Sequence, residues 1–290
     1  MDIGATKINY GLVSLTGRIF NNQRVKTKPA FLKQLKEIIS QNLSPKVSAI
    51  GISFAGPVNS RKGVVLKAFN FSGSPKNISL KKLVSSWSKK LVFVENDAAC
   101  FSLAEAIFGP GKNCDPVIGI TLGTGVGGSI IINKKIYHGH SHGAELGHMK
   151  ITEKGFRCSC KKIGHFESHV SGPAMIKYYK KFTDQTRGTY QIVELAAKGN
   201  KRAKRVINTM GYFLGLGLAN IANALDPEIM VIGGGLSEIK SLFPPAIKTM
   251  KKELISRELN KVKIVKSKLG NNAMLLGAAL ITQSKYRSKI

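Results

Sequence analysis

Acidic residues are scarce in this sequence. Its 290 residues include 45 Lys and Arg but only 16 Asp and Glu, so the formal net charge at pH 7 is +29. Such an excess is typical of nucleic-acid surfaces, where basic patches neutralise phosphates. The basic residues are nevertheless spread over several stretches, 76–90, 177–205 and 261–289, and no aromatic platform accompanies them. We therefore interpret the charge as the solvated surface of a lysine-rich protein and expect no specific nucleic-acid partner.

Long apolar runs and abundant cysteines are also absent. No stretch reaches about 18 consecutive apolar residues, so the sequence predicts no membrane-spanning helix and no membrane partner. The first residues, MDIGATK, carry an acid and lead into no apolar run, which excludes a secretory signal. The four cysteines are too few to crosslink a chain of this length, and two of them form a Cys-x-Cys pair that indicates a metal rather than a disulfide. We expect a reducing compartment, the cytoplasm.

Strand-like and helix-like segments alternate along the chain, which predicts an α/β fold. We expect strands at 8–13, 47–53, 64–67, 91–94, 117–122, 129–132 and 229–232. We expect helices at 31–41, 80–90, 97–108, 175–181, 191–197, 202–225 and 273–284. A sheet-rich stretch that opens on a strand and a glycine turn occurs near residue 1 and again near residue 117. That recurrence indicates two related domains around one cleft.

Two glycine turns lie beside expected strands, DIGATK at 2–7 and LGTGVGG at 122–128. Because glycine lacks a Cβ atom, backbone N–H groups of such turns can converge on phosphate oxygens. Thr6 and Thr124 offer hydroxyl groups to the same oxygens, and Asp2 is suited to hold Mg²⁺ through water. Tight hairpins use the same residues, so one turn alone decides nothing. A third glycine run, 233–235, follows another strand, and the three together favour a nucleotide site.

The segment Glu95-Asn96-Asp97 stands where an expected strand ends and an expected helix begins. Two interpretations are open. Asn96 or Asp97 is a common helix N-cap residue, and capping alone would explain the segment. Alternatively, Asp97 accepts a proton from a hydroxyl group while Asn96 positions a sugar ring, because a kinase that acts on an alcohol needs a carboxylate aimed at the attacking oxygen.

Two histidines and two cysteines follow one another closely in the centre of the chain: His148, Cys158, Cys160 and His165. Two thiolates and two imidazoles form a closed Cys₂His₂ set that suits tetrahedral Zn²⁺ in a structural site. The alternative is a chance grouping of buried cysteines and surface histidines. The remaining histidines are expected to be solvated loop residues: His138, His140, His142 and His169.

These segments together resemble the ROK family of sugar kinases and repressors, over essentially the whole sequence. The matching motifs are DIGATK, ENDA, LGTGVGG, AELGH, the Cys-x-Cys element with HFE, VIGGG and the final GNNAMLLGAALI. The resemblance implies the actin-like (ribonuclease H-like) ATPase fold, with two α/β domains around a central cleft. We place a smaller domain at 1–112 plus 276–290 and a larger domain, which carries the zinc element, at 113–275.

The resemblance also implies roles for single residues. Asp97 would be the catalytic base. The sugar hydroxyls would be bound by Gly56, Asn96, Asp97, Glu145, His148 and Glu167. ATP with Mg²⁺ would be bound by Asp2, Gly4, Thr6, Lys7, Gly123, Thr124, Gly125, Gly127, Gly234 and Gly235. Structural Zn²⁺ would be held by His148, Cys158, Cys160 and His165, so His148 would serve both metal and sugar.

The sequence departs from the family pattern at four positions within the matching motifs. Ala5 and Ala144 stand where the pattern has glycine, and both changes are small. Lys161 replaces the glycine after the second cysteine, so the local turn is expected to differ. His165 replaces the usual third cysteine, which keeps a ligand but changes the donor set. Family members also carry several apolar residues before the aspartate that is Asp2 here. Either the natural start lies upstream or this strand is short, and a short strand is expected to loosen the Mg²⁺ side of the site.

We therefore predict an ATP-dependent hexose kinase that phosphorylates the 6-hydroxyl of glucose. The alternatives are a kinase for N-acetylhexosamine or fructose and, from another class, a sugar-sensing ROK transcriptional regulator. Regulators of this family carry a winged-helix domain ahead of the DIGAT-like segment and often lose the phosphate turns, whereas both turns are intact here. The expected partners are hexose and ATP, and we expect a homodimer or a larger homo-oligomer.

Overall fold

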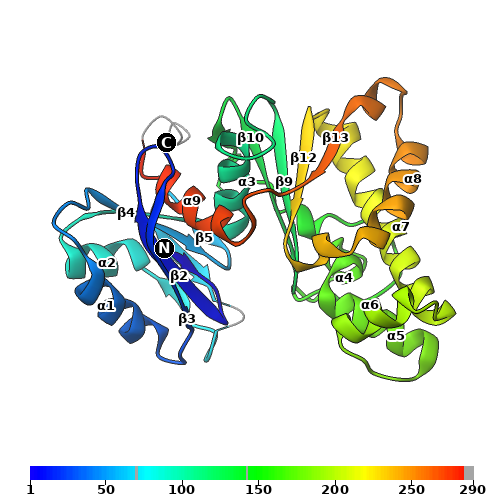
Figure 1. Cartoon of the computed structure of the whole chain (residues 1–290), viewed down its shortest axis with the longest axis horizontal. Helices are drawn as coiled ribbons and strands as arrows, with labels where there is room; N and C mark the ends of the chain where they lie inside the picture. Colours follow the sequence, from blue (N-terminus) through cyan, green and yellow to red (C-terminus); the bar gives the residue numbers. More distant parts are fainter. Residues whose placement is uncertain (69–70, 142, 284–290) are drawn as a thin grey trace. The chain divides into compact units, whose positions relative to one another are not determined.

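The structure, a computed structural model, describes residues 1–68, 71–141 and 143–283. The chain divides into two compact units (Figure 1). The first contains Met1–Asn113, Ser129–Ala144 and Lys268–Ile290, and the second contains Cys114–Gly128 and Glu145–Ser267. Among the described residues, no helix combines the length and the apolar character needed to cross a bilayer.

The first unit is built on a five-stranded sheet with the order β3-β2-β1-β4-β8. Its strands are β1 (Asp2–Ile3), β2 (Lys7–Val13), β3 (Ile19–Lys26), β4 (Ala49–Phe54) and β8 (Leu91–Asn96). The strands β1, β4 and β8 are parallel, whereas β2 is antiparallel to both of its neighbours. Because parallel strands end at the same edge of a sheet, the turn after β1, the segment after β4 and the start of the helix after β8 share one edge.

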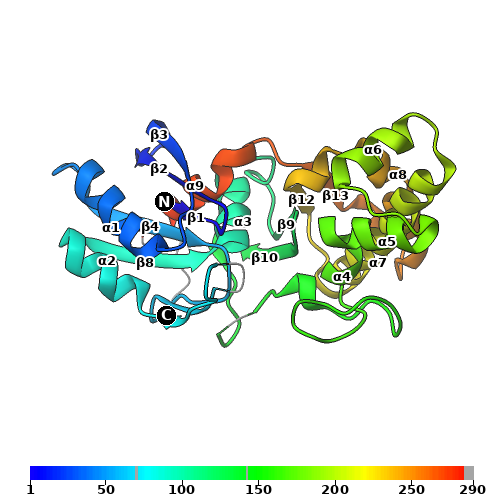
Figure 2. The same cartoon turned by 90° about the horizontal axis from the view of Figure 1, so that it is seen from below.

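One face of this sheet is apolar because the strands alternate in polarity with a period of two residues. Ile3, Ile52 and Val94 belong to this face and are buried. Helices α1 (Phe31–Asn42) and α2 (Leu80–Ser88) cover it, and they lie on the same side of the sheet in Figures 1 and 2. Both helices contribute to the same hydrophobic core through Phe31, Leu35, Leu80 and Val84.

The opposite face carries a row of polar residues that crosses all five strands. Strand register pairs Glu95 with Ser53, Ser53 with Asp2, Asp2 with Asn9, and Asn9 with Arg24. Paired positions place their side chains on the same face of a sheet. Within this row, Ser53 lies between Glu95, near the end of β8, and Asp2, at the start of the first glycine turn.

Helices α3 (Asp97–Ile107) and α9 (Ala273–Leu280) pack against each other, and α9 packs on β4. Both contacts depend on glycine. A Cβ atom on Gly51 would meet the Ala278 carbonyl oxygen at 1.5 Å, and a Cβ atom on Gly277 would meet the Cys100 carbonyl oxygen at 1.9 Å. Because no side chain can fit at either position, the two glycines set how closely α9 approaches the sheet and α3. A small sheet of β5 (Val58–Asn59), β6 (Val64–Lys67) and β7 (Lys76–Ile78) completes the unit.

A second five-stranded sheet repeats the order of the first, as β11-β10-β9-β12-β13. Its strands are β9 (Val117–Leu122), β10 (Val126–Ile132), β11 (Lys135–Ile136), β12 (Ile229–Gly233) and β13 (Lys263–Lys266). In the second unit, β12 is parallel to β9 and β13. The long helix α7 (Lys201–Leu225) contacts α4 (Glu167–Val170), α5 (Gly172–Thr183), α6 (Thr189–Ala197) and α8 (Phe243–Glu253), which gather around it in Figure 2.

Most of the expected elements are present, although some bounds differ. The strand expected at 129–132 begins earlier, at Val126, which shortens the glycine turn before it. The elements that were not expected include β3, β13 and α8, and Pro244 and Pro245 lie in the first turn of α8, where proline is tolerated. The last helix ends at Leu280, and position 284, the end expected for it, lies outside the described residues. The repeated strand order agrees with the expectation of two related halves.

Replacing Gly277 with alanine tests the contact between α9 and α3. The added Cβ atom collides with backbone, which cannot rotate away as a side chain can, so we expect a loss of stability of about 1–3 kcal/mol. Urea unfolding followed by circular dichroism measures it. Gly188→Ala is the matched control, because its Cβ atom would meet nothing closer than the Gln191 side chain at 3.8 Å. Equal unfolding midpoints for the two variants would contradict the packing argument.

Candidate active site

The first glycine turn joins β1 to β2 and is held by backbone bonds. The Gly4 N–H donates to the Lys7 carbonyl at 3.0 Å, and the Thr27 hydroxyl donates to the Gly4 carbonyl at 2.7 Å. Thr6 and Lys7 are exposed at the end of this turn. The Asp2 carboxylate accepts the Ser53 hydroxyl at 2.9 Å, and its burial raises the pKa of Asp2. A divalent cation beside Asp2 would favour the charged form and oppose that shift.

Asn96 is the N-cap of α3, as the capping interpretation requires. Its side-chain oxygen accepts from the N–H groups of Ala98 at 2.9 Å and Ala99 at 3.2 Å. Its amide nitrogen donates to the Gly56 carbonyl at 3.1 Å, so the cap also fixes the segment after β4. Gly56 has a φ of +152°, and a Cβ atom there would meet the Lys67 carbonyl at 2.9 Å, which explains why glycine occupies the position.

Asp97 is the first residue of α3 and is half-buried. Its carboxylate accepts from the Ala98 N–H at 2.9 Å. Negative charge is stabilised at the N-terminus of a helix, where unpaired N–H groups point outward. The capping and catalytic interpretations are thus compatible, because Asn96 makes the cap and Asp97 presents the carboxylate.

The second glycine turn joins β9 to β10 in the second unit and comprises Gly123, Thr124 and Gly125. The Gly123 N–H donates to the Gly125 carbonyl at 2.9 Å. Nothing lies within 4 Å of where a Cβ atom on Gly123 or Gly235 would stand, so both backbones face open space. Gly234, with φ +83°, packs its Cα against the carbonyl of Leu122. Gly127, expected in the turn, lies instead within β10.

Glu167 connects the second glycine turn to the cysteine loop. One carboxylate oxygen accepts the Val126 N–H at 3.2 Å, and the other accepts the Ser159 hydroxyl at 2.8 Å and the Cys158 thiol at 3.4 Å. A Cβ atom on Gly125 would meet the first of these oxygens at 2.4 Å. A side chain at 125 would therefore displace the Glu167 carboxylate from this position.

The structure brings the four predicted metal ligands together. One donor atom from each of His148, Cys158, Cys160 and His165 lies within 4.8 Å of all the others. The Cys158 sulfur is 3.6 Å from His148 Nδ1, and the Cys160 sulfur is 3.2 Å from His165 Nδ1. Two soft thiolates and two imidazoles fit tetrahedral Zn²⁺. His148 and Cys160 are exposed, whereas Cys158 and His165 are buried.

Burial changes the proton affinity of two of these ligands. Desolvation raises the pKa of Cys158 to about 11 and lowers the pKa of His165. The imidazole is therefore neutral, as a metal ligand must be, whereas the thiol keeps its proton near neutral pH unless a cation replaces it. Metal binding at this cluster is expected to release that proton.

Two residues that replace a glycine of the family pattern have a left-handed backbone. Ala144, before Glu145, has φ +66°, and Lys161 has φ +74°. Such a conformation costs a residue with a Cβ atom about 1–2 kcal/mol. The turn at Lys161 is closed by the bond of its N–H to the Cys158 carbonyl at 2.9 Å. We expected the change at Ala144 to be small. The turn is formed, but its left-handed backbone is less favourable for alanine than for glycine.

The prediction of solvated histidines is wrong at two positions. His169 is buried between Phe156 and Phe213, its Nδ1 bonds the Tyr178 hydroxyl, and burial lowers its pKa to about 4. His138 is half-buried, and its Nε2 lies 2.6 Å from the Glu95 carboxylate. His140 is exposed as expected, and His142 lies outside the described residues.

Three serines that were not predicted as site residues donate hydrogen bonds to acids of the candidate site. They are Ser53 on Asp2, Ser60 on Glu95 and Ser159 on Glu167. Ser159, which stands between the two cysteines, carried a signal in the sequence. Ser53 and Ser60 carried none, because their partners lie 51 and 35 residues away along the chain.

The sequence profile of the ROK family matches residues 1–285. The chain belongs to the ROK family. Among curated relatives, the glucokinase of Streptomyces coelicolor is 33% identical over 304 residues, covering 96% of this chain and 95% of the relative. The N-acetyl-D-glucosamine kinase of Photobacterium profundum is 30% identical over 301 residues, covering 98% of each.

Solved ROK structures share the fold of this chain. The ROK glucokinase from Streptomyces griseus, in complex with glucose and AMPPNP, superposes with a TM-score of 0.83 at 32% identity and covers 97% of both chains. A ROK transcriptional regulator, a homologue of the E. coli MLC protein, superposes with a TM-score of 0.86 at 27% identity, covering 99% of this chain and 77% of the regulator. The predicted actin-like ATPase fold is confirmed, and the family at this similarity includes both kinases and regulators.

Zinc is expected to copurify with the protein at about one ion per chain, since the cluster offers one closed set of four donors. Cys158→Ser removes one thiolate and is expected to abolish this zinc, as measured by inductively coupled plasma mass spectrometry. Cys114→Ser is the matched control, because Cys114 is a buried cysteine of the same unit outside the cluster. Wild-type protein that is folded and free of zinc after growth in zinc-supplemented medium would contradict the site.

Proposed function

We propose that this ROK protein transfers the γ-phosphoryl group of ATP to the 6-hydroxyl of a hexose, with glucose as the first choice. The class of enzyme, an ATP-dependent sugar kinase, follows from glucokinase and N-acetylglucosamine kinase relatives that align over nearly the whole chain. The observation that carries the proposal is the Asp97 carboxylate, half-buried at the N-terminus of α3 beside a cap that is tied to Gly56.

In this proposal Asp97 accepts the proton of the 6-hydroxyl as the phosphoryl group arrives. A phosphoryl transfer requires little covalent chemistry from the protein, so positioning the attacking oxygen and stabilising charge supply most of the catalysis. The remaining N–H of the Asn96 amide is available to a sugar hydroxyl, because the other bonds Gly56. Glu145, His148 and Glu167 of the second unit supply further polar groups. With Nδ1 of His148 on the cysteine side, its Nε2 remains for a hydroxyl.

The nucleotide is assigned to the two glycine turns. The open backbones of Gly123 and Gly235 and the exposed Thr6 and Lys7 are groups that bind phosphate oxygens. Mg²⁺, held through water by Asp2, would neutralise charge on the phosphates during transfer. The zinc cluster would act structurally, because it orders the loop on which Ser159 meets Glu167.

The sugar among the hexoses depends on a few hydrogen bonds. A site built to bond one hydroxyl or amide group rejects the analogue that lacks it. N-acetylhexosamine and fructose remain the alternatives, since a relative of similar identity is an N-acetyl-D-glucosamine kinase. We further propose a homodimer or larger homo-oligomer. Thiolate ligands and ATP as donor suit a reducing compartment, the cytoplasm.

Asp97→Asn tests the assignment of the base. The change keeps the volume and the bond from the Ala98 N–H but removes the proton acceptor, so we expect kcat to fall by about 10²- to 10⁴-fold with little change in hexose affinity. An ADP-release assay over glucose, N-acetylglucosamine, N-acetylmannosamine and fructose measures it and identifies the sugar. Glu37→Gln, at an exposed acid of the same unit, is the control. Near-normal turnover in Asp97→Asn would refute the role of Asp97.

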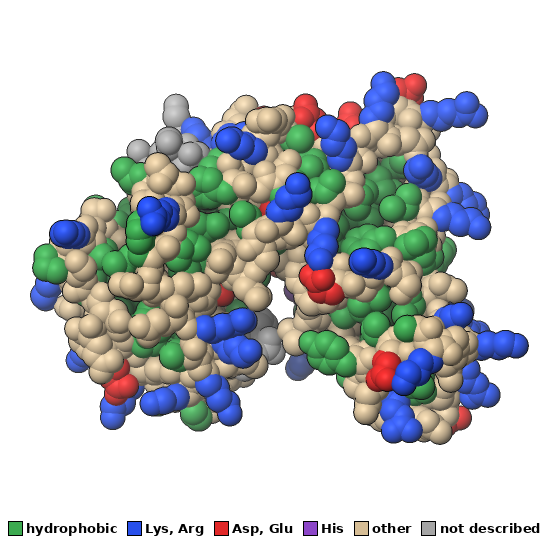
Figure 3. Space-filling model, in the orientation of Figure 1, with side chains coloured by type: hydrophobic (Ala, Val, Ile, Leu, Met, Phe, Trp, Pro, Cys, Tyr) green, Lys and Arg blue, Asp and Glu red, His purple; other side chains and the backbone are tan. Residues whose placement is uncertain are grey.

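The regulator is the second candidate, and the net charge of +29 is the observation that favours it. Figure 3 shows Lys and Arg side chains scattered over the visible face rather than gathered into a stripe. Scattered cations attract DNA without reading its bases, because base recognition needs an element shaped for a groove. The polar acids of the site suit neutral hydroxyls better than a phosphate backbone.

Duplex DNA is therefore expected to bind weakly, with a Kd of about 10⁻⁶ M or weaker at physiological salt and a steep salt dependence. Fluorescence anisotropy on random duplexes, with and without hexose, measures this. Selection of one sequence bound about 10³-fold more tightly than random DNA, in a sugar-dependent manner, would instead establish the regulator.

A further inference from the structure

The carboxylate of Glu95 is buried, with the residue 5% exposed, and it accepts hydrogen bonds from three directions. One oxygen accepts the Asn96 N–H at 2.8 Å and the Ser60 hydroxyl at 2.7 Å. The other oxygen lies 2.6 Å from His138 Nε2. An ionised carboxylate only accepts hydrogen bonds, so this bond requires a hydrogen on Nε2 of His138, as in the neutral Nε2–H tautomer or the imidazolium.

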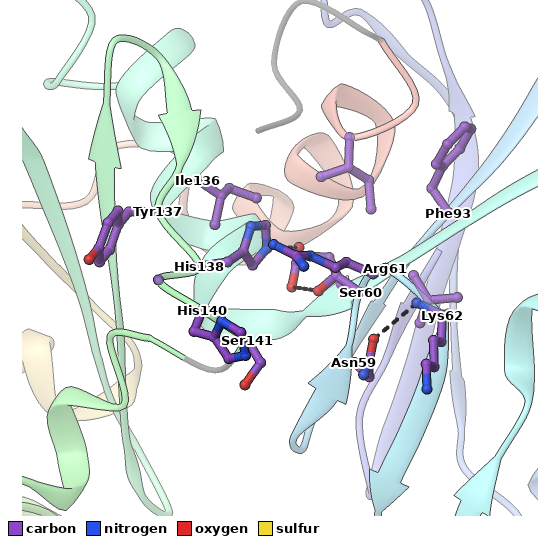
Figure 4. Close-up of a pocket in the computed structure, with 14 residues that line it drawn as sticks. Asn59, Ser60, Arg61, Lys62, Phe93, Ile136, Tyr137, His138, His140 and Ser141 are labelled. Carbon is purple, nitrogen blue, oxygen red and sulfur yellow. Dashed lines mark hydrogen bonds and ion pairs between the residues drawn. The ribbon is translucent and has the colours of Figure 1, made fainter. Parts of the chain in front are cut away.

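The three donors come from three separate segments of the first unit. Asn96 ends β8, Ser60 lies in the turn between β5 and β6, and His138 follows β11. Figure 4 shows Ser60 and His138 extending from different ribbons towards one another. Glu95 therefore ties two loops to the strand end from which α3 begins.

These hydrogen bonds include the backbone N–H of Asn96, the residue before the proposed base Asp97. The Asn96 N–H that Glu95 holds belongs to the N-cap of α3, and the next side chain in the chain is Asp97. If the Glu95 carboxylate turns, the Asn96 peptide loses its acceptor, and the junction that carries Asp97 loses one of the bonds that fix it. A small misplacement of a catalytic group lowers a rate severely without unfolding the protein.

His138 is the donor whose loss would free the carboxylate. Charge-assisted bonds of this length are among the strong ones, and a buried carboxylate oxygen without its donor must find another. The two bonds that remain are both on the other oxygen, so they restrain rotation less than bonds on both oxygens do.

We propose that His138 is a positioning residue for phosphoryl transfer: through Glu95 it fixes the strand-to-helix junction that carries Asp97. It does not touch substrate. This inference rests on the proposed function. It differs from a purely structural role, in which His138 would only anchor its own loop.

A cavity of about 370 Å³ makes the inference testable by chemical rescue. The cavity lies in the first unit, and Ser60, Arg61, Glu95, His138 and His140 are among the residues that line it. Shortening His138 to alanine leaves the space of an imidazole ring next to the Glu95 carboxylate, and the cavity gives free imidazole access to that space.

The experiment measures kcat and KM with the preferred hexose for wild type, His138→Ala, His138→Gln and His140→Ala. Wild type must first phosphorylate a hexose; if it does not, the proposed function fails and the inference falls with it. With an active wild type, we expect His138→Ala to lower kcat by about 10- to 100-fold while the KM for ATP is unchanged. Added imidazole is expected to restore part of kcat, and His138→Gln, whose amide also donates, to retain most of it.

His140→Ala is the matched control, because His140 lines the same cavity but makes none of the bonds to Glu95. It is expected to show wild-type kinetics with and without imidazole. Wild-type kcat in His138→Ala would overturn the inference and leave the kinase intact. Low activity that neither imidazole nor His138→Gln restores, together with a lowered melting temperature, would also overturn it, since it would show that His138 only stabilises the fold.

Discussion

A carboxylate removed from water must be given hydrogen-bond donors, and this requirement organises the candidate site residues within each unit. In the first unit, Glu95 collects a backbone N–H, a serine and a histidine. In the second unit, Glu167 collects a backbone N–H, a serine and a thiol. Ser60 and His138 reach Glu95 from 35 and 43 residues away, and Val126 reaches Glu167 from 41 residues away, so satisfying one acid positions more than one segment. The cysteine loop and the residue after the second glycine turn are both bonded to Glu167.

Because acidic residues are scarce in this chain, the positions of the few that are present bear on its function. The first unit contains five acids, and Glu37 alone among them is exposed, whereas Asp2, Glu95, Asp97 and Glu105 are buried or half-buried. The surface around them is strongly basic. A basic surface attracts the negatively charged nucleotide, whereas the acids withdrawn into the fold supply acceptors for hydroxyl groups and Mg²⁺. The +29 charge thus agrees with a sugar kinase of the ROK family, whose nucleotide substrate is anionic.

Much of the site was predictable because its signals are local. A strand followed at once by Asn-Asp predicts a cap and a helix, and α3 begins at Asp97 as expected. Four metal-type ligands within one short segment predicted a single site, and their donor atoms lie close together. Glycine turns between strands are likewise set by neighbours in the chain. The start of β10 at Val126 was misjudged because Gly127 and Gly128 were interpreted as part of the turn, whereas the strand accommodates them.

The sequence by itself therefore determined the family, the alternation of strands and helices, the two glycine turns and the metal-ligand set, because each depends on residues a few positions apart. Only the tertiary structure decided which side chains hold the acids. His138 and Glu95 are 43 residues apart, and Ser53 and Asp2 are 51 apart. The register of β1 and β4 brings Ser53 to Asp2, whereas the segment after β11 brings His138 to Glu95 from a different sheet. The burial of His169 is of the same kind, because it depends on Phe213, which α7 supplies. The type of each side chain is known from the sequence, whereas the packing of distant segments determines which group it contacts.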